Sequence, residues 1–215
     1  MDTLNYIYQK YQIAEESRDK VRIEIPNTDR ISLARLFGEL KFKVGAEIGV
    51  ERAIYSKSLL TRIPELKLYL VDPWKAYKGY REHVSQSKLD GFYNETVKRV
   101  ANWPNTEIVR KYSIEAARTF PDKFFDFVYI DANHEFRHAV DDIAEWYPKV
   151  KVGGILAGHD YIKRNNPEYL MGVIPAINGY IEAYDLKPLF IFGRKEFVEG
   201  EKRDKPRSWM LIKEK

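Results

Sequence analysis

Short apolar runs alternate with amphipathic segments along most of the chain, and this alternation strongly limits the folds available to it. Seven runs are candidate strands: Val44–Val50, Lys67–Asp72, Thr106–Arg110, Phe125–Asp131, Gly154–His159, Pro188–Phe192 and Ser208–Ile212. Several are apolar nearly throughout, which is typical of strands buried on both faces of a parallel sheet. Between them lie segments such as residues 135–150, whose apolar side chains recur at helical spacing. The alternation predicts an α/β fold with a doubly wound, mostly parallel sheet.

The last two candidate strands are expected to pair in the opposite direction. Their connection, residues 193–206, is short and polar and has no room for a packed crossover helix. A parallel pair needs a longer crossover, so these strands should form an antiparallel hairpin. We expect residues 1–40 to form an N-terminal helical arm and residues 41–215 to form the sheet-bearing core of a single domain.

Composition excludes several classes of protein. The chain has 215 residues and no cysteine, so neither disulfides nor thiolate metal sites are available to it. No apolar run approaches the roughly 18 residues of a membrane span, and the polar N-terminus lacks a secretory signal. We therefore expect a cytoplasmic protein. The net charge of +4 raises the question of a nucleic-acid partner, but basic and acidic residues are interleaved throughout, which favours a solvated surface.

Polar residues gather at the ends of the first two candidate strands. Ligands of open α/β sheets bind beyond the carboxyl ends of the strands, so these residues are candidates for a binding site. The candidates here are Glu47, Gly49, Ser56, Asp72, Pro73 and Trp74. A glycine at a strand-to-helix turn lets the backbone approach a ligand, and the helix N-terminus would face that ligand. The residues alone also allow a plain tight turn at Gly49 and a turn or N-cap role for Asp72.

Further candidates close the next three strands. Ser113 and Ile114 follow the third strand, where Ser113 could also be a helix N-cap. The fourth strand ends in Asp131-Ala132-Asn133-His134, and the fifth ends in Gly158-His159-Asp160-Tyr161. Two carboxylates and two imidazoles therefore come to neighbouring strand ends, as acid–base chemistry or metal binding would require.

The chain resembles class I methyltransferases that use S-adenosylmethionine (SAM). The resemblance is carried by Glu47-Ile48-Gly49, by Asp72 and by the stretch FDFVYIDANHEFRHAVDDIAEWYPKVKVGGILAGHDY, and it covers roughly Lys43 to Ile212. That stretch is similar to the branch of small-molecule and sugar O-methyltransferases, the methyltransferase 24-like domains. The resemblance implies a Rossmann-like, seven-stranded sheet of order 3-2-1-4-5-7-6.

The resemblance also implies how SAM would bind. Asp72 would accept hydrogen bonds from the ribose hydroxyls, Ser113 and Ile114 would line the adenine, and the sulfonium would lie over the turn at Glu47 and Gly49. The remaining predicted cofactor contacts are Ser56, Pro73, Trp74 and Asp131. The family continues its loop with further glycines, whereas this chain has Glu51 and Ala53 there. Glu51 disfavours a dinucleotide pyrophosphate, because like charges would meet.

Catalytic and metal-binding roles follow from the same resemblance. In metal-dependent relatives the positions of Asp131, His159 and Asp160 hold a divalent ion. Mg²⁺ prefers oxygen ligands, and His159 would offer a nitrogen instead. The site would therefore bind either a softer ion such as Mn²⁺, Fe²⁺ or Zn²⁺, or no metal. The resemblance makes His134 the general base for an acceptor hydroxyl, with Asp131 and Asp160 as further catalytic residues. The plainer alternative is a His134 that only hydrogen-bonds Asp131.

The expected reaction is SN2 methyl transfer to a small-molecule or sugar hydroxyl. The acceptor pocket could be walled by Trp74, Tyr77 and Tyr80, or these residues could belong to a packed surface helix.

Four alternative functions compete with this one, and each is either disfavoured or left open. An NAD-dependent enzyme is disfavoured, because the chain lacks the G-x-G-x-x-G motif at its first turn. A nucleic-acid methyltransferase is disfavoured by the interleaved charges. An amine methyltransferase and a non-catalytic SAM-binding protein stay open. The resemblance does not fix the oligomeric state. Relatives often form dimers, so the chain could be a homo-oligomer or a monomer.

Overall fold

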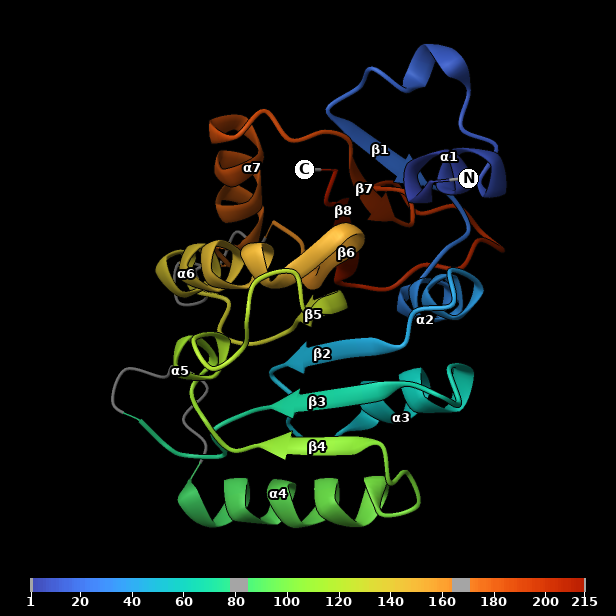
Figure 1. Cartoon of the computed structure of the whole chain (residues 1–215). Coiled ribbons are helices and arrows are strands. Elements are labelled where there is room, and N and C mark those ends of the chain that lie inside the picture. Colours follow the sequence, from blue (N-terminus) through green and yellow to red (C-terminus); the bar gives the residue numbers. More distant parts are fainter. Residues whose placement is uncertain (1, 78–84, 164–170, 215) are drawn as a thin grey trace.

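The computed structural model describes residues 2–77, 85–163 and 171–214, and within them the chain folds around one eight-stranded sheet (Figure 1). The strands are β1 (Arg22–Ile25), β2 (Val44–Ile48), β3 (Lys67–Val71), β4 (Thr106–Val109), β5 (Phe125–Ile130), β6 (Val150–Tyr161), β7 (Leu189–Phe192) and β8 (Arg207–Ile212). Their order across the sheet is β1-β7-β8-β6-β5-β2-β3-β4. Only β8 runs antiparallel to its neighbours, β6 and β7. The carboxyl ends of the other strands therefore lie at one edge of the sheet.

The predicted order of seven strands is confirmed from β4 to β7, including the antiparallel hairpin. The arm predicted for residues 1–40 is wrong in one respect, because it contains the strand β1, which pairs in parallel with β7 at the edge of the sheet. In β1, Ile23 and Ile25 are buried while Arg22 and Glu24 are exposed. An alternation of only four residues, with two of them charged, is too short to stand out in the sequence.

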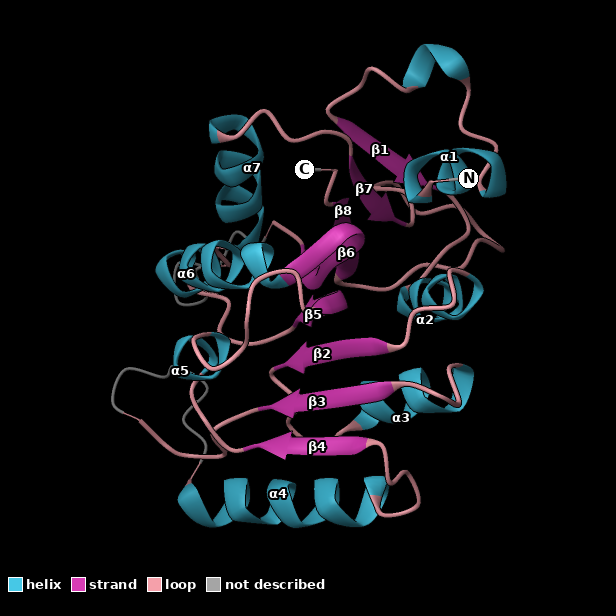
Figure 2. Ribbon diagram, in the orientation of Figure 1, coloured by secondary structure: helices cyan, strands magenta, loops and turns pink. Residues whose placement is uncertain are grey.

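Helices cover both faces of the sheet, as Figure 2 shows. One hydrophobic cluster contains residues from α1 (Thr3–Lys10), α2 (Arg30–Glu39), α3 (Ile54–Arg62) and the end of α4 (Gln86–Val100). The other contains residues from α5 (Ser113–Ala117), α6 (Phe136–Trp146) and α7 (Val173–Ala183). Two short 3₁₀ turns, η1 (Glu15–Ser17) and η2 (Tyr147–Lys149), complete the described elements. None of the helices among these residues is long and apolar enough to cross a membrane.

The helix α2 connects the missed strand to the predicted core. Its N-cap is Asp29, whose side chain accepts a hydrogen bond from the backbone of Ser32 at 2.7 Å, and the two residues form a capping box. The helix buries Leu33, Ala34, Leu36 and Phe37 and packs against α3. Since α2 starts just after β1, its first turn lies at the edge of the sheet where the parallel strands end.

Candidate active site

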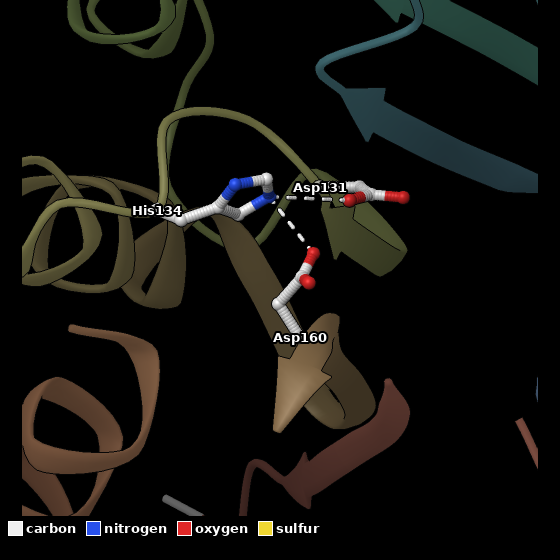
Figure 3. A group of neighbouring side chains, drawn as sticks. All are labelled: Asp131, His134 and Asp160. Atoms are coloured by element: carbon white, nitrogen blue, oxygen red, sulfur yellow. Dashed lines mark ion pairs between the residues drawn. The ribbon is translucent and has the colours of Figure 1, made fainter. Parts of the chain in front are cut away.

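A cluster of acids and histidines lies at the carboxyl ends of β5 and β6, which are neighbours in the sheet (Figure 3). Asp131 directly follows β5, His134 lies in the loop before α6, and Asp160 lies near the end of β6. The Nε2 atom of His134 is 2.8 Å from Oδ2 of Asp160 and 3.7 Å from Oδ1 of Asp131. The Nδ1 atom of His159 is 3.2 Å from the same Asp160 oxygen and 3.7 Å from Asp131 Oδ1. The structure thus brings together all the residues predicted to lie at these two strand ends.

Burial and mutual contact perturb the ionisation of the cluster. Burial alone would lower the pKa of His134, but the contacts of its imidazole with the carboxylates of Asp131 and Asp160 outweigh that effect and raise the pKa to about 10. Burial likewise opposes the charged form of His159, and its contact with Asp160 and the charge of Asp131 raise its pKa. For Asp160 the effect of burial is overcome by hydrogen bonds from His134 and His159, which hold its pKa well below the usual range. In this arrangement the imidazole of His134 is protonated at neutral pH and lies against the Asp160 carboxylate.

The donor atoms of the cluster suit a divalent cation. One oxygen of Asp131, one nitrogen of His134 and one oxygen of Asp160 all lie within 4.8 Å of one another. This set contains His134 where the sequence predicts His159, although His159 also contacts the Asp160 carboxylate. Mixed imidazole and carboxylate ligands fit Mn²⁺, Fe²⁺ or Zn²⁺ better than Mg²⁺. The residues present therefore fit a transition-metal ion.

The turn after β2 lies directly against this cluster. Gly49 has a φ of +87°, and a Cβ atom added there would lie 2.1 Å from the carbonyl oxygen of Asp131. Gly49 therefore permits a close approach to the protein's own backbone, a role that the sequence analysis did not foresee. Glu51 and Ala53 occupy the later glycine positions of the family, yet their φ angles of +52° and +56° lie in the region that glycine favours. The turn thus keeps the glycine-like conformation without the glycines.

Asp72, predicted to bind ribose, fixes the same turn through backbone hydrogen bonds. Its Oδ2 accepts from the amides of Val50 and Glu51 at 3.0 Å each, and its Oδ1 accepts from the amide of Trp74 at 2.8 Å. The turn role for Asp72 is therefore present in the structure, and it leaves one lone pair, on Oδ1, for a further donor. Burial raises the pKa of the carboxyl group, while these three amides act to lower it.

Two predicted cofactor residues, Glu47 and Ser56, form a buried pair beneath the turn. The Ser56 hydroxyl donates a hydrogen bond to Glu47, and the two residues are 0% and 2% exposed, respectively. Burial raises the pKa of Glu47 to about 8, against the opposing effects of Ser56 and of the Arg30 charge. Glu47 is therefore mostly protonated at neutral pH. In this conformation neither side chain reaches a ligand, and their contribution is to support the turn.

Ser113 and Ile114 form the start of α5. The helix N-cap is Tyr112, without a side-chain bond, so the alternative of Ser113 as the N-cap is wrong by one residue. The Ser113 hydroxyl donates to the buried Asp142 and accepts from Nε1 of Trp146 at 2.9 Å. Burial raises the pKa of Asp142 to about 7. These contacts hold the loop after β4 against α6. Ile114, the next residue, is half-buried.

The aromatic residues predicted as a pocket wall divide into two groups. The ring of Trp74 is fully buried and donates a hydrogen bond to the carbonyl of Glu51, so it packs into the core and does not wall an open pocket. Tyr77 is half-buried, and its hydroxyl accepts a hydrogen bond of 2.8 Å from the side chain of Asn133. Its ring meets that of Tyr112 edge to face, with centroids 5.8 Å apart. Tyr80 lies outside the described residues.

Asn133 and Tyr112 were not singled out from the sequence. Asn133 lies between Asp131 and His134, so the polar character of that whole strand end was the available signal. With Tyr77 these residues connect the loops after β3, β4 and β5 above the end of β2. A small pocket behind the cluster is lined by Asp131, Asn133, His134, His159 and Trp209, among others. A wider groove along the edge strand β4 contains none of the cluster residues.

The sequence matches a family model described as a methyltransferase domain over residues 46–161. This match spans the carboxyl ends of β2 to β6 and all the residues of the acid–histidine cluster. Among curated proteins, none matches the chain in sequence.

Solved O-methyltransferases share the fold. TomG from Streptomyces achromogenes, involved in tomaymycin synthesis and solved with SAM, is 14% identical, with a TM-score of 0.59 over 99% of this chain and 90% of that chain. An O-methyltransferase from Bacillus cereus, solved with S-adenosylhomocysteine (SAH), is 13% identical, with a TM-score of 0.58 over 98% and 90%. A putative caffeoyl-CoA O-methyltransferase from Staphylococcus aureus is 10% identical, with a TM-score of 0.58 over 97% and 90%. At such identities the likeness concerns the fold.

Proposed function

The chain belongs to the methyltransferase domain family, and from that premise we propose that it transfers the methyl group of SAM to a hydroxyl of a small molecule. The observation that carries this proposal is that two different groups of residues lie side by side at the carboxyl ends of the strands. Asp72 and the turn at Gly49 lie at the ends of β2 and β3, and the acid–histidine cluster lies beside them at the ends of β5 and β6. A methyl donor and an activated acceptor need to meet at such a junction.

The cofactor would lie across the ends of β2, β3 and β4. Asp72 would accept a hydrogen bond from a ribose hydroxyl with the lone pair that the turn amides leave unused on Oδ1. Ser113 and Ile114 would border the adenine, with Tyr77 and Tyr112 as aromatic neighbours. The sulfonium would then point toward Asp131, because Gly49 brings the turn against that residue.

The acceptor hydroxyl would lie beside His134. We assign His134 as the general base from its place between Asp131 and Asp160, and these carboxylates would orient the imidazole. Because the same carboxylates raise the pKa of His134 to about 10, the imidazole must first release the proton that it carries at neutral pH, and only its neutral form can accept the proton of the acceptor hydroxyl. A hydroxyl attacks poorly until its proton is accepted or its oxygen is held by a cation. Transfer itself then needs the oxygen, the methyl carbon and the sulfur in line, so the main contribution of the protein is positioning.

The same cluster would hold a divalent metal ion, through Asp131, Asp160 and one or both histidines. A bound ion would supply positive charge that lowers the pKa of the acceptor hydroxyl. It would also offset the negative charge of the carboxylates, as the proton on His134 does without an ion. Titration with MnCl₂, followed by the electron paramagnetic resonance signal of free Mn²⁺, tests this site directly. We expect the wild-type protein to bind Mn²⁺ and Asp160→Asn to bind it at least about tenfold more weakly. Equal binding by both proteins would contradict the assignment.

Calorimetric titration with SAH tests the cofactor site. We expect the wild-type protein to bind SAH and Asp72→Ala to bind it about 100-fold more weakly, because a charge-assisted hydrogen bond to ribose is lost and the turn amides lose their acceptor. Thermal unfolding of the same variant checks that the turn still folds without its carboxylate. Asp19→Ala, at an exposed acid of the N-terminal region, is the matched control and should leave SAH binding unchanged. Unaltered binding in Asp72→Ala would remove the ribose assignment.

A panel of catechols, phenols and sugars, assayed for SAH formation with SAM as donor, tests the reaction. We expect methylation of at least one hydroxyl compound, with the product identified by a mass increase of one methylene group. A panel of amines run in parallel separates oxygen from nitrogen acceptors. Transfer to amines alone would contradict the proposed acceptor class while leaving the cofactor site intact.

A further inference from the structure

The strand β6 contains a bulge at the point where it enters the acid–histidine cluster. Its pairing with β8 shifts register between Gly158 and Tyr161, so that β6 has one residue more than β8 in this interval. The residues inside the interval are His159 and Asp160. Asp160 has a φ of +58°, in the left-handed region that side chains other than glycine rarely adopt. The backbone of β6 thus departs from a regular strand at the two residues that it contributes to the cluster.

The bulge brings two consecutive side chains to the same place. In a regular strand successive side chains point to opposite faces of the sheet, so only one of these two residues would reach the cluster. In the structure Nδ1 of His159 lies 3.2 Å from Oδ2 of Asp160 and 3.7 Å from Oδ1 of Asp131. The same Asp160 oxygen lies 2.8 Å from Nε2 of His134. The geometry of the cluster therefore depends on the bulge.

Trp209 of β8 packs against the bulge and donates a hydrogen bond to it. Its indole Nε1 lies 3.0 Å from the carbonyl oxygen of His159, which accepts this bond. The side chain is 1% exposed and belongs to the hydrophobic cluster that contains residues of α5, α6 and α7. A Cβ atom added to Gly158 would lie 2.5 Å from the Trp209 ring, so the glycine lets the ring pack closely against β6. Packing therefore fixes the ring, and the ring fixes the carbonyl of the bulge.

We propose that Trp209 is a positioning residue for the acid–histidine cluster, because its indole N–H holds the bulge that directs the Asp160 carboxylate toward a divalent ion. This inference rests on the proposed function, which places the ion at Asp131, Asp160 and the histidines. Trp209 acts through the backbone of His159, so its replacement leaves the set of ligands intact and changes their arrangement. Residues that orient metal ligands in this way typically contribute about 10- to 100-fold to metal affinity.

Manganese titration of Trp209→Phe tests this role. Phenylalanine keeps an aromatic ring in the core but has no N–H, so the carbonyl of His159 loses its donor. We expect the variant to bind Mn²⁺ about tenfold more weakly than wild type, measured by the electron paramagnetic resonance signal of the free ion. SAH affinity, measured by calorimetry, should stay within about threefold of wild type, because the turn at Gly49 and Asp72 is unchanged.

Trp146→Phe is the matched control, since it removes the same atoms from another buried tryptophan. Trp146 is 0% exposed, belongs to the same hydrophobic cluster and donates from Nε1 to the Ser113 hydroxyl at 2.9 Å. Thermal unfolding should show a similar loss of stability in both variants, whereas only Trp209→Phe should bind Mn²⁺ more weakly. An equal loss of Mn²⁺ affinity in both variants would overturn the inference, because the loss would then follow stability.

A second variant removes the hydrogen bond without removing the bulk of the ring. Site-specific replacement of the Trp209 indole by benzothiophene keeps a bicyclic ring of nearly the same shape and eliminates only the N–H. This variant should fold even if Trp209→Phe does not, and it should show the same tenfold loss of Mn²⁺ affinity. If it binds Mn²⁺ as tightly as wild type does, the positioning role is overturned and the metal site stands.

The remaining outcomes distinguish this inference from the proposed function. If the wild-type protein binds SAH but not Mn²⁺, the metal site and the role of Trp209 fail together, and the proposed cofactor site stands. If the wild-type protein binds neither, the proposed function itself fails.

Discussion

The carboxyl ends of β2 and β3 are built differently from those of β5 and β6. At β2 and β3 the key contacts are made by backbone: Asp72 binds three amides, and Gly49 allows a turn to touch the next loop. At β5 and β6 the contacts join side chains, and each of two imidazoles lies within 3.7 Å of both carboxylates. The first region suits binding of a cofactor against a fixed backbone turn. The second suits proton transfer or the binding of a metal ion.

The two regions also treat acidic side chains in opposite ways. Burial raises the pKa of Glu47 to about 8, since its hydrogen-bond partner is the uncharged Ser56. At Asp160 the same effect of burial is overcome by His134 and His159, which hold its pKa below the usual range. One acid is therefore neutral and structural, and the other is charged and available for chemistry. The difference comes from the partners, because both side chains are largely buried.

His134→Ala should produce the largest effect and separates the two regions most clearly. We expect turnover to fall by about 10² to 10⁴, the usual contribution of a general base. SAH affinity should stay within about threefold of wild type, because Asp72 and its turn are unchanged. Turnover is measured as SAH formation with an acceptor that the wild-type protein methylates, and affinity by calorimetry.

His138→Ala is the matched control for this measurement. His138 is an exposed histidine in the first turn of α6, one helical turn from His134. Its replacement should leave both turnover and affinity unchanged. A fully active His134→Ala enzyme would remove His134 from the mechanism and leave the cluster with a metal-binding or structural role.

Gly49→Ala should damage both regions together, because the new Cβ would strike the Asp131 backbone. We expect a loss of about 4 kcal/mol in the free energy of unfolding, from the left-handed φ and from overpacking. The unfolding temperature should fall by roughly 8 to 16 °C, and SAH binding should fall with it. Gly179→Ala in α7 is the control, since its Cβ would meet open space and alanine favours the helix. If Gly49→Ala is as stable as wild type, the two regions are not in the contact that the structure describes.

Glu47→Gln tests whether the buried acid is neutral, through the pH dependence of stability. The folded-state pKa is about 8 and the model value is 4.5, so the folded chain binds the proton more tightly. The wild-type protein should lose stability as the pH rises from 4.5 through 8, by on the order of 3 kcal/mol. Glutamine stays neutral and can still accept from Ser56, so the variant should lack this loss. Denaturant titrations between pH 5 and pH 8 measure the difference.

An exposed acid provides the control for the pH series. Glu115→Gln, in α5, should follow the wild-type pH dependence. A wild-type curve parallel to that of Glu47→Gln would mean that Glu47 ionises normally despite its burial.

Much of this architecture could be predicted from the sequence. The long apolar strands predicted a mostly parallel sheet, and the family resemblance implied its order. The polar residues at strand ends identified both regions, because parallel strands must end at one edge. The strand β1 was missed because its alternation is four residues long. The burial of Trp74 and the pairing of Glu47 with Ser56 could not be predicted, since both depend on how α3 and α4 pack beneath the turn.

The smallest expected effect concerns the hydrogen bond between Tyr77 and Asn133, which links the loops of the two regions. Tyr77→Phe should lower the free energy of unfolding by about 1 kcal/mol, the usual net value of such a bond. Asn133→Ala should cost more, because Asn133 also accepts from the amide of Glu135. In a double-mutant cycle the two changes should couple by about 1 kcal/mol. Tyr184→Phe, at an exposed tyrosine of the α7 end, should have no effect. Additive losses would mean that this hydrogen bond does not couple the two regions.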